Sequence, residues 1–138
     1  MVLTVEEIMS RKMPRIKASA NAFQAAKKMK AGKLGYLMVV EGGRPVGIVT
    51  EADLVGKVLA RGINPEKVAV SRFMSKPLIT VPPHHDIAAA SMLMAKHNIR
   101  HLPVVDGDRL VGVVTAKDII KHVRSYIEVL VRSVLYEE

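Results

Sequence analysis

Residues 46–53 read VGIVTEAD, and residues 111–118 read VGVVTAKD. Each octapeptide holds a Val-Gly pair, two β-branched residues, and a threonine followed three residues later by an aspartate. When the sequence is compared with itself at an offset of roughly 65 residues, residues 5–55 align on residues 70–120 without a gap. The chain is therefore a tandem duplication, and the paired octapeptides predict a matching pair of sites.

Each repeat shows the same predicted order of elements. A short β segment, at Arg15-Ile16 or Thr80-Val81, leads into a helix with apolar residues three and four positions apart. Two β-branched runs then form a hairpin, at residues 36–50 in the first copy and 101–115 in the second, and a helical pattern follows each. The sequence predicts an α/β protein of the α+β kind, built from two β-α-β-β-α repeats.

The predicted domain bounds follow from this alignment and from the turn residues Gly62 and Pro65. The first repeat takes residues 1–62, residues 63–69 form the linker and the start of the second repeat, and residues 70–138 form the second repeat with an extended C-terminal helix. Because about 60 residues make only a marginal core, we expect the halves to pack on each other as a pseudo-two-fold pair.

The composition excludes several classes of protein. The 138 residues include no cysteine, which rules out disulfides, thiolate catalysis and cysteine-ligated zinc. No apolar run approaches the ~20 residues of a membrane helix, and Glu6 and Glu7 stand where a signal peptide carries bases. We therefore expect a cytoplasmic protein without membrane association.

The charge is strongly positive, at +8 with a pI near 9.9. Most of the excess lies in the first quarter of the chain, which a solvated helix face explains and which leaves nucleic-acid binding as the alternative function. No helix-turn-helix or zinc-finger pattern supports that alternative, and only 4% of the residues are aromatic. The bases of this cluster are Arg11, Lys12, Arg15, Lys17, Lys27, Lys28, Lys30 and Lys33.

Three features give the chain a resemblance to a known family, the CBS domain. They are the Met-Ser pairs at residues 9–10 and 74–75, the stretch IRHLPVVD at residues 99–106, and the two octapeptides. Members of this family usually occur as tandem pairs, called Bateman modules. The resemblance implies two related clefts between the repeats, which bind AMP, ADP, ATP or S-adenosylmethionine, and a regulatory role toward an unidentified partner. It implies no catalysis.

The octapeptide residues suit a nucleotide on chemical grounds. Thr50 and Thr115 lie where a helix begins, and free backbone N–H groups favour a phosphate there. Asp53 and Asp118 offer two acceptor oxygens, which match the two vicinal ribose hydroxyls. The alternative is purely structural, because Thr-x-x-Asp is close to a capping box, which stabilises a helix start by ~1 kcal/mol without any ligand.

The resemblance assigns further residues to the clefts. Those that resemble the family's phosphate-facing positions are Arg100, His101 and Lys117, and those that resemble its adenine-binding positions are Ile16, Thr80, Val81, Leu37, Leu102 and Pro103. The first repeat departs from the pattern, since residues 35–38 read GYLM where the second repeat has RHLP, and Arg15 replaces Thr80. Arg15 can restore part of the phosphate-binding charge, and we expect one cleft to bind better than the other.

The remaining motifs point away from chemistry and toward assembly. His97 and His101 are four residues apart, but Asn98 and Pro103 predict that the helix ends between them, so we expect no zinc site. No nucleophile with a partner base is evident, so no catalytic residue is assigned. The C-terminal helix carries an apolar stripe from Ile119 to Leu135, for which packing on its own core and a two-fold partner are both open, and we expect a homodimer.

Overall fold

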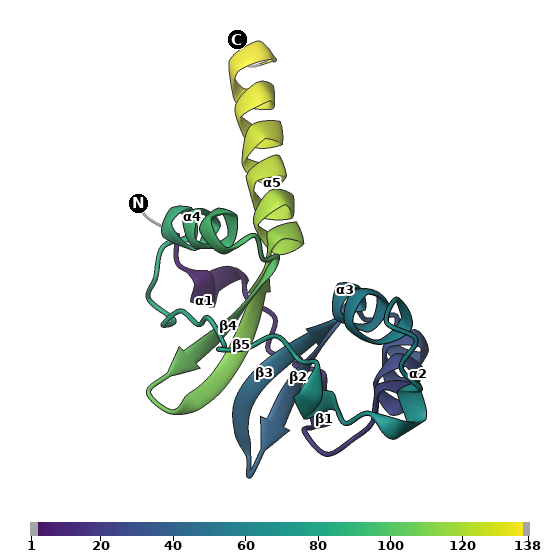
Figure 1. Ribbon diagram of the computed structural model, residues 1–138. Coiled ribbons are helices and arrows are strands. Elements are labelled where there is room, and N and C mark those ends of the chain that lie inside the picture. The colour runs from purple at the N-terminus through teal and green to yellow at the C-terminus, as the bar shows by residue number, and fades with distance from the viewer. Residues whose placement is uncertain (1–2, 137–138) are drawn as a thin grey trace. The chain divides into compact units, whose positions relative to one another are not determined.

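The computed structural model describes residues 3–136 and divides the chain into two compact units (Figure 1). Unit 2 is the continuous segment Lys12–Ile79, whereas unit 1 combines the residues up to Arg11 with those from Thr80 onward. Both units contain helices and strands, which confirms the predicted α+β class. The compact units are therefore not identical with the sequence repeats, because each contains a short segment of the other repeat.

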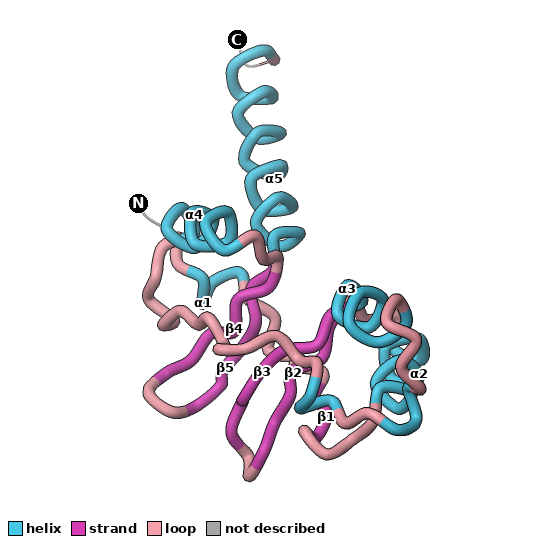
Figure 2. Tube along the Cα trace, viewed as in Figure 1, coloured by secondary structure: helices cyan, strands magenta, loops and turns pink. Residues whose placement is uncertain are grey.

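The sheet of unit 2 has three strands in the order β1-β2-β3. Strand β1 (Arg15–Lys17) runs parallel to β2 (Tyr36–Glu41), and β2 runs antiparallel to β3 (Arg44–Thr50). The hairpin turn places Gly42 and Gly43 at φ +57° and +80°, the left-handed conformations that a tight primed turn requires (Figure 2). The glycine-rich hairpin predicted from the sequence is thus confirmed.

The helices of unit 2 cover the apolar face of this sheet. Helix α2 (Ala22–Gly32) begins at Asn21, whose side chain accepts the Gln24 N–H at 2.8 Å, and it buries Ala25 and Met29. The helix includes Gly32, and the residue after it, Lys33, adopts the left-handed conformation that caps the helix. Helix α3 (Glu51–Asp53) passes directly into a π-helix, η1 (Leu54–Leu59), and two 3₁₀ turns, η2 (Pro65–Lys67) and η3 (Val70–Arg72), complete the unit.

Unit 1 repeats this plan but differs in its first β segment and in its last helix. It contains α1 (Val5–Ile8), α4 (Ile87–His97), the hairpin of β4 (His101–Asp106) and β5 (Arg109–Thr115), and the long helix α5 (Ala116–Leu135). The predicted β segment at Thr80-Val81 forms a single parallel bridge from Val81 to Val104 rather than a strand. Pro82 and Pro83 explain the difference, because proline has no N–H to continue the ladder.

The repeated Met-Ser pairs explain the repeated glycines of the octapeptides. Ser75 pairs with Ile48 on β3, through N–H···O bonds of 2.8 and 3.2 Å, and Ser10 pairs with Val113 on β5, at 2.9 and 3.0 Å. A β-carbon added at Gly47 would lie 2.6 Å from Met74 Sδ. Gly47 and Gly112 therefore admit a neighbouring backbone.

Substitution of Gly112 by alanine is expected to lower the free energy of unfolding by about 2 kcal/mol, measured by urea denaturation. The new β-carbon would lie 2.9 Å from the carbonyl oxygen of Ser10, which the bridge to Val113 holds in place. Gly56→Ala is the matched control, since no atom lies within 4 Å of its added β-carbon. An equal loss in both variants would show that the close approach is not the cause.

Candidate functional site

Both octapeptides form capping boxes at the starts of helices. In the first, the Thr50 N–H donates to Asp53 Oδ2 at 2.9 Å, and the Asp53 N–H donates to Thr50 Oγ1 at 3.3 Å. In the second, the Thr115 N–H donates to Asp118 Oδ2 at 2.9 Å, and the Asp118 N–H donates to Thr115 Oγ1 at 3.1 Å. The structural alternative considered for the Thr-x-x-Asp motif is therefore present in both copies, whether or not a ligand also uses these groups.

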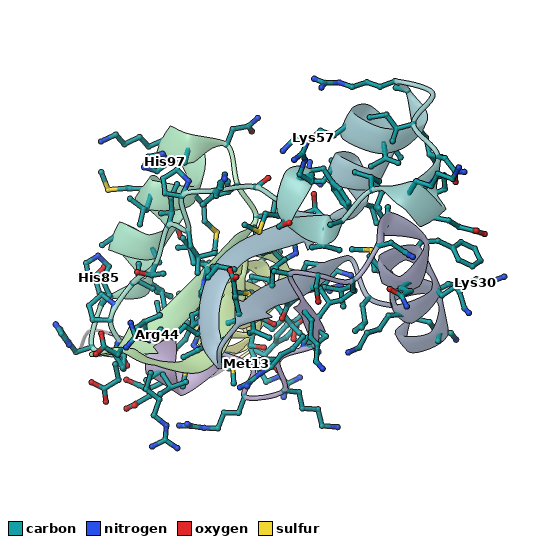
Figure 3. The ribbon with its side chains drawn as sticks, turned by 60° about the horizontal axis from the view of Figure 1, so that its bottom comes forward. Met13, Lys30, Arg44, Lys57, His85 and His97 are labelled. Carbon is teal, nitrogen blue, oxygen red and sulfur yellow. The ribbon has the colours of Figure 1, made fainter. Side chains whose placement is uncertain are left out.

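The carboxylate of Asp53 is engaged well beyond its capping box. Lys57 Nζ lies 3.0 Å from Oδ1, and the Ser75 hydroxyl donates to the carboxylate at 3.0 and 3.2 Å. Lys57 also donates to the Phe73 carbonyl at 3.2 Å, and Figure 3 labels it. Asp53 is only 5% exposed. Its charge is thus neutralised inside unit 2, and few lone pairs are left for a ribose.

Asp118 is in a different electrostatic situation. The residue four positions later is His122, where the first copy has Lys57, so Asp118 has no counterpart of the Asp53–Lys57 ion pair. The side chain is half-buried rather than buried. Of the two predicted ribose-binding carboxylates, Asp118 is therefore the one with acceptor capacity available for a ligand.

Three of the predicted phosphate-binding residues gather around Asp118 in unit 1. His101 lies opposite Thr115 in the β4-β5 register, the Arg100 carbonyl accepts the Ala116 N–H at 2.9 Å, and Lys117 is exposed in the first turn of α5. Strand pairing brings these separate stretches together, because residues 100–101 and 115–118 occupy the same end of the hairpin. Their phosphate-binding role remains a prediction.

The protonation of His101 bears on that role. Burial lowers the pKa of His101, the neighbouring Arg100 charge lowers it further, and the Asp118 carboxylate opposes both effects. Because the pKa falls below the ordinary value of 6.5, the ring is neutral near pH 7. A phosphate at this place would therefore meet a neutral hydrogen-bonding ring at His101, and its charge would be balanced by Arg100 and Lys117.

Unit 2 holds a separate open pocket of about 650 Å³ between β1 and α2. Three cations border it, Arg15, Lys17 and Lys28, and Lys28 Nζ donates to the Arg15 carbonyl. The rest of the lining consists of polar Ser19 and Gln24 with apolar Ile16, Ala20 and Val40. The pocket thus unites the predicted residues Arg15 and Ile16.

Lys17, Lys28 and Gln24 were not predicted from the sequence to belong to a binding site, yet they line this pocket. Two local spacings could have found them. Residues 15 and 17 are two apart on a strand, so their side chains point to the same side of the sheet. Residues 24 and 28 are four apart on a helix, so their side chains lie on the same face of it. Only the packing of α2 beside β1 shows that these two sides meet.

The other predicted adenine-binding residues are part of the packed interior. Leu37 belongs to the apolar core of unit 2, and Leu102, Pro103 and Val81 are buried, whereas Thr80 is exposed. Four of these five positions, all but Thr80, are therefore accounted for as ordinary core. Their contact with an adenine ring stays a prediction.

Neither a metal cluster nor a membrane-spanning helix is present in the part of the chain that the structure describes. No three histidine or carboxylate side chains of residues 3–136 are grouped so that they could hold a metal ion. No helix of those residues is both long enough and apolar enough to cross a bilayer.

Comparison with known proteins agrees with the duplicated fold. The family profile described as the CBS domain matches residues 5–60 and again residues 70–125. An uncharacterized protein of Methanopyrus kandleri is 37% identical over 121 residues, which are 86% of this chain and 62% of the relative. This chain thus spans less than two thirds of that relative.

Two solved structures share both sequence and fold with the chain. A protein with CBS domains from Burkholderia ambifaria is 30% identical, with a TM-score of 0.85, over 88% of this chain and 94% of the other. The hexameric CBS-CP12 protein from bloom-forming cyanobacteria is 38% identical, with a TM-score of 0.81, over 87% of this chain and 67% of the other.

Proposed function

Because the chain belongs to the CBS domain family, we propose that it is a regulatory module that binds an adenosine compound, AMP, ADP, ATP or S-adenosylmethionine, without catalysis of its own. The ligand would stabilise one state of the module, and an unidentified partner would respond to that state. A cytoplasmic location remains an expectation from the sequence.

The observation that carries this proposal is the basic pocket of unit 2. Its volume of about 650 Å³ lies within the ~300–1,000 Å³ usual for small-ligand sites. Arg15 can grip a phosphate with two parallel hydrogen bonds, and Lys17 and Lys28 add point charges. Of the apolar lining residues, Ala20 and Val40 are half-buried and offer a surface for a base, whereas the side chain of Ile16 belongs to the core of unit 2. The pocket therefore combines the chemistry of phosphate and of base in one place.

The surroundings of Asp118 in unit 1 also support the proposal that the chain binds an adenosine compound. The Asp118 carboxylate has no counterpart of the Lys57 ion pair, and Arg100, His101 and Lys117 lie at the same end of the hairpin. A ribose on the carboxylate and a phosphate near the cations would use all of these groups. We propose that this group prefers nucleotides with an intact ribose, because a deoxyribose would leave one acceptor unpaired.

Calorimetric titration with AMP, ADP, ATP and S-adenosylmethionine tests the proposal. Arg15→Ala is expected to weaken binding of the preferred phosphate compound about 10-fold, since charge-assisted bonds contribute ~1.5–3 kcal/mol. Lys30→Ala is the matched control, because Lys30 is an exposed lysine of α2 outside the pocket lining (Figure 3). If the wild type binds none of the four compounds, the proposal is wrong.

Titration of the same variants with RNA or DNA, at several salt concentrations, tests the nucleic-acid alternative that the charge leaves open. Binding to RNA or DNA would weaken steeply with salt, and Arg15→Ala and Lys30→Ala would reduce it alike, because both remove one positive charge. Binding of a nucleotide in the pocket would be weakened by Arg15→Ala and not by Lys30→Ala.

Self-association is the remaining part of the proposal. The related CBS-CP12 protein is hexameric. We propose that this chain forms at least a homodimer, which buries apolar surface that the described structure leaves exposed.

A further inference from the structure

Helix α5 extends away from the rest of unit 1 as a single free-standing helix (Figure 1). Its apolar side chains are exposed along almost its whole length, and Ile120, Leu130 and Val134 keep 67%, 61% and 70% of their accessible surface. None of the residues from 116 to 135 is buried. A helix with such a face is not stable in water by propensity alone, so the face requires a cover.

The spacing of the exposed apolar residues indicates what kind of partner covers this face. Ile120, Val123, Ile127, Leu130 and Val134 follow one another at intervals of three, four, three and four residues. This alternation is the a/d pattern of a heptad repeat, whose period of about 3.5 residues keeps a narrow stripe facing a partner helix.

We propose that α5 pairs with α5 of a second copy of this chain as a parallel, in-register, two-stranded coiled coil. This inference deepens the proposed self-association and names its surface. The three a positions, Ile120, Ile127 and Val134, are all β-branched, and the two d positions are Val123 and Leu130. β-branched residues at a with leucine at d favour two parallel strands.

The residues at positions e and g, which flank the a and d positions, also favour a second copy of this chain as the partner. In a parallel pair Tyr126 at g lies beside Val131 at e of the partner helix, and these side chains are 55% and 43% exposed. Lys121, Glu128 and Arg132 fall at b and f, away from the seam, whereas Arg124 falls at e, where it lies beside Ile119 at g of the partner helix. Like charges therefore do not meet across the interface, and the apolar seam becomes wider.

The area is sufficient for a stable pair. Seven apolar side chains lie along the seam on each helix, the five at a and d together with Tyr126 and Val131. At roughly 100 Å² for each, they bury about 700 Å² per copy, close to the ~800 Å² per partner of a standard interface. A single helix face thus provides nearly the whole area that a specific dimer needs.

Sedimentation equilibrium on the full chain tests the seam. The wild type is expected to be dimeric, and Leu130→Glu, which places a charge in the seam, is expected to weaken the dimer by about 100-fold or more. Val129→Glu is the matched control, because Val129 is 64% exposed on the same turn but at position c. This variant is expected to remain dimeric, and circular dichroism checks that all three proteins are folded.

Disulfide trapping tests the orientation, since the chain has no cysteine of its own. A parallel pair in register brings Leu130→Cys against the same position of the partner, so mild oxidation is expected to give a covalent dimer, and Val129→Cys is expected to give none. A failure of Leu130→Cys to cross-link would overturn the parallel register.

Other results separate this inference from the proposed self-association. If the wild type is oligomeric and Leu130→Glu leaves it so, the seam is wrong while self-association stands. If the wild type is a monomer at every concentration, both are wrong. An assembly larger than a dimer that Leu130→Glu disperses would overturn the two-stranded pairing.

Discussion

Asp53→Ala is expected to lower the free energy of unfolding by about 3 kcal/mol. The substitution removes the shared acceptor of four donors, the N–H and hydroxyl of Thr50, the Ser75 hydroxyl and the Lys57 ammonium. It leaves a lysine without its counter-charge beside the Phe73 carbonyl. Breaking a fully buried pair costs ~3–5 kcal/mol, and the 41% exposure of the Lys57 side chain places this case at the lower end. Urea denaturation measures the change.

Glu51→Ala is the matched control for Asp53→Ala, because it removes one negative charge from the same helical turn at an exposed position. A change within about 0.5 kcal/mol is expected for it. The double variant Asp53→Ala/Lys57→Met should recover part of the loss, since it removes the unpaired cation too. If Asp53→Ala is no less stable than Glu51→Ala, the carboxylate is not the centre of this network.

Asp118→Asn is expected to weaken binding of the preferred adenosine compound by about 10- to 100-fold, with little loss of stability. Asparagine keeps an oxygen that can cap helix α5, so the capping box survives in part, whereas the charge and one acceptor are lost. Calorimetric titration of the wild type and of Asp118→Asn measures the affinity.

Deoxy-compounds sharpen this test. If Asp118 accepts from the ribose hydroxyls, the wild type should bind the 2′-deoxy analogue less well than the ribonucleotide, and Asp118→Asn should bind the two alike. Asp53 provides the internal contrast, because its carboxylate is already occupied by Lys57 and Ser75. Unchanged affinity in variants of both aspartates would remove the ribose role from either residue.

The two aspartates show how far a motif alone can be interpreted. The spacing Thr-x-x-Asp predicted the capping box in both copies equally, since its atoms lie within one helical turn. The two further contacts of Asp53 differ in whether the sequence shows them. Lys57, four residues beyond Asp53, is visible in the sequence, but Ser75 is 22 residues away and reaches the carboxylate only through the folded chain.

The sequence by itself determined the duplication, the α+β class, the hairpins and the apolar stripe of the C-terminal helix. These features depend on periodicity and turn chemistry, which neighbouring residues establish among themselves. The tertiary structure alone decided that Met9-Ser10 joins the unit of β5 and Met74-Ser75 the unit of β3, and that Lys28 lies beside Arg15. The physical reason is that pairing between distant segments depends on which backbones can approach, and one sequence without coordinates does not specify that.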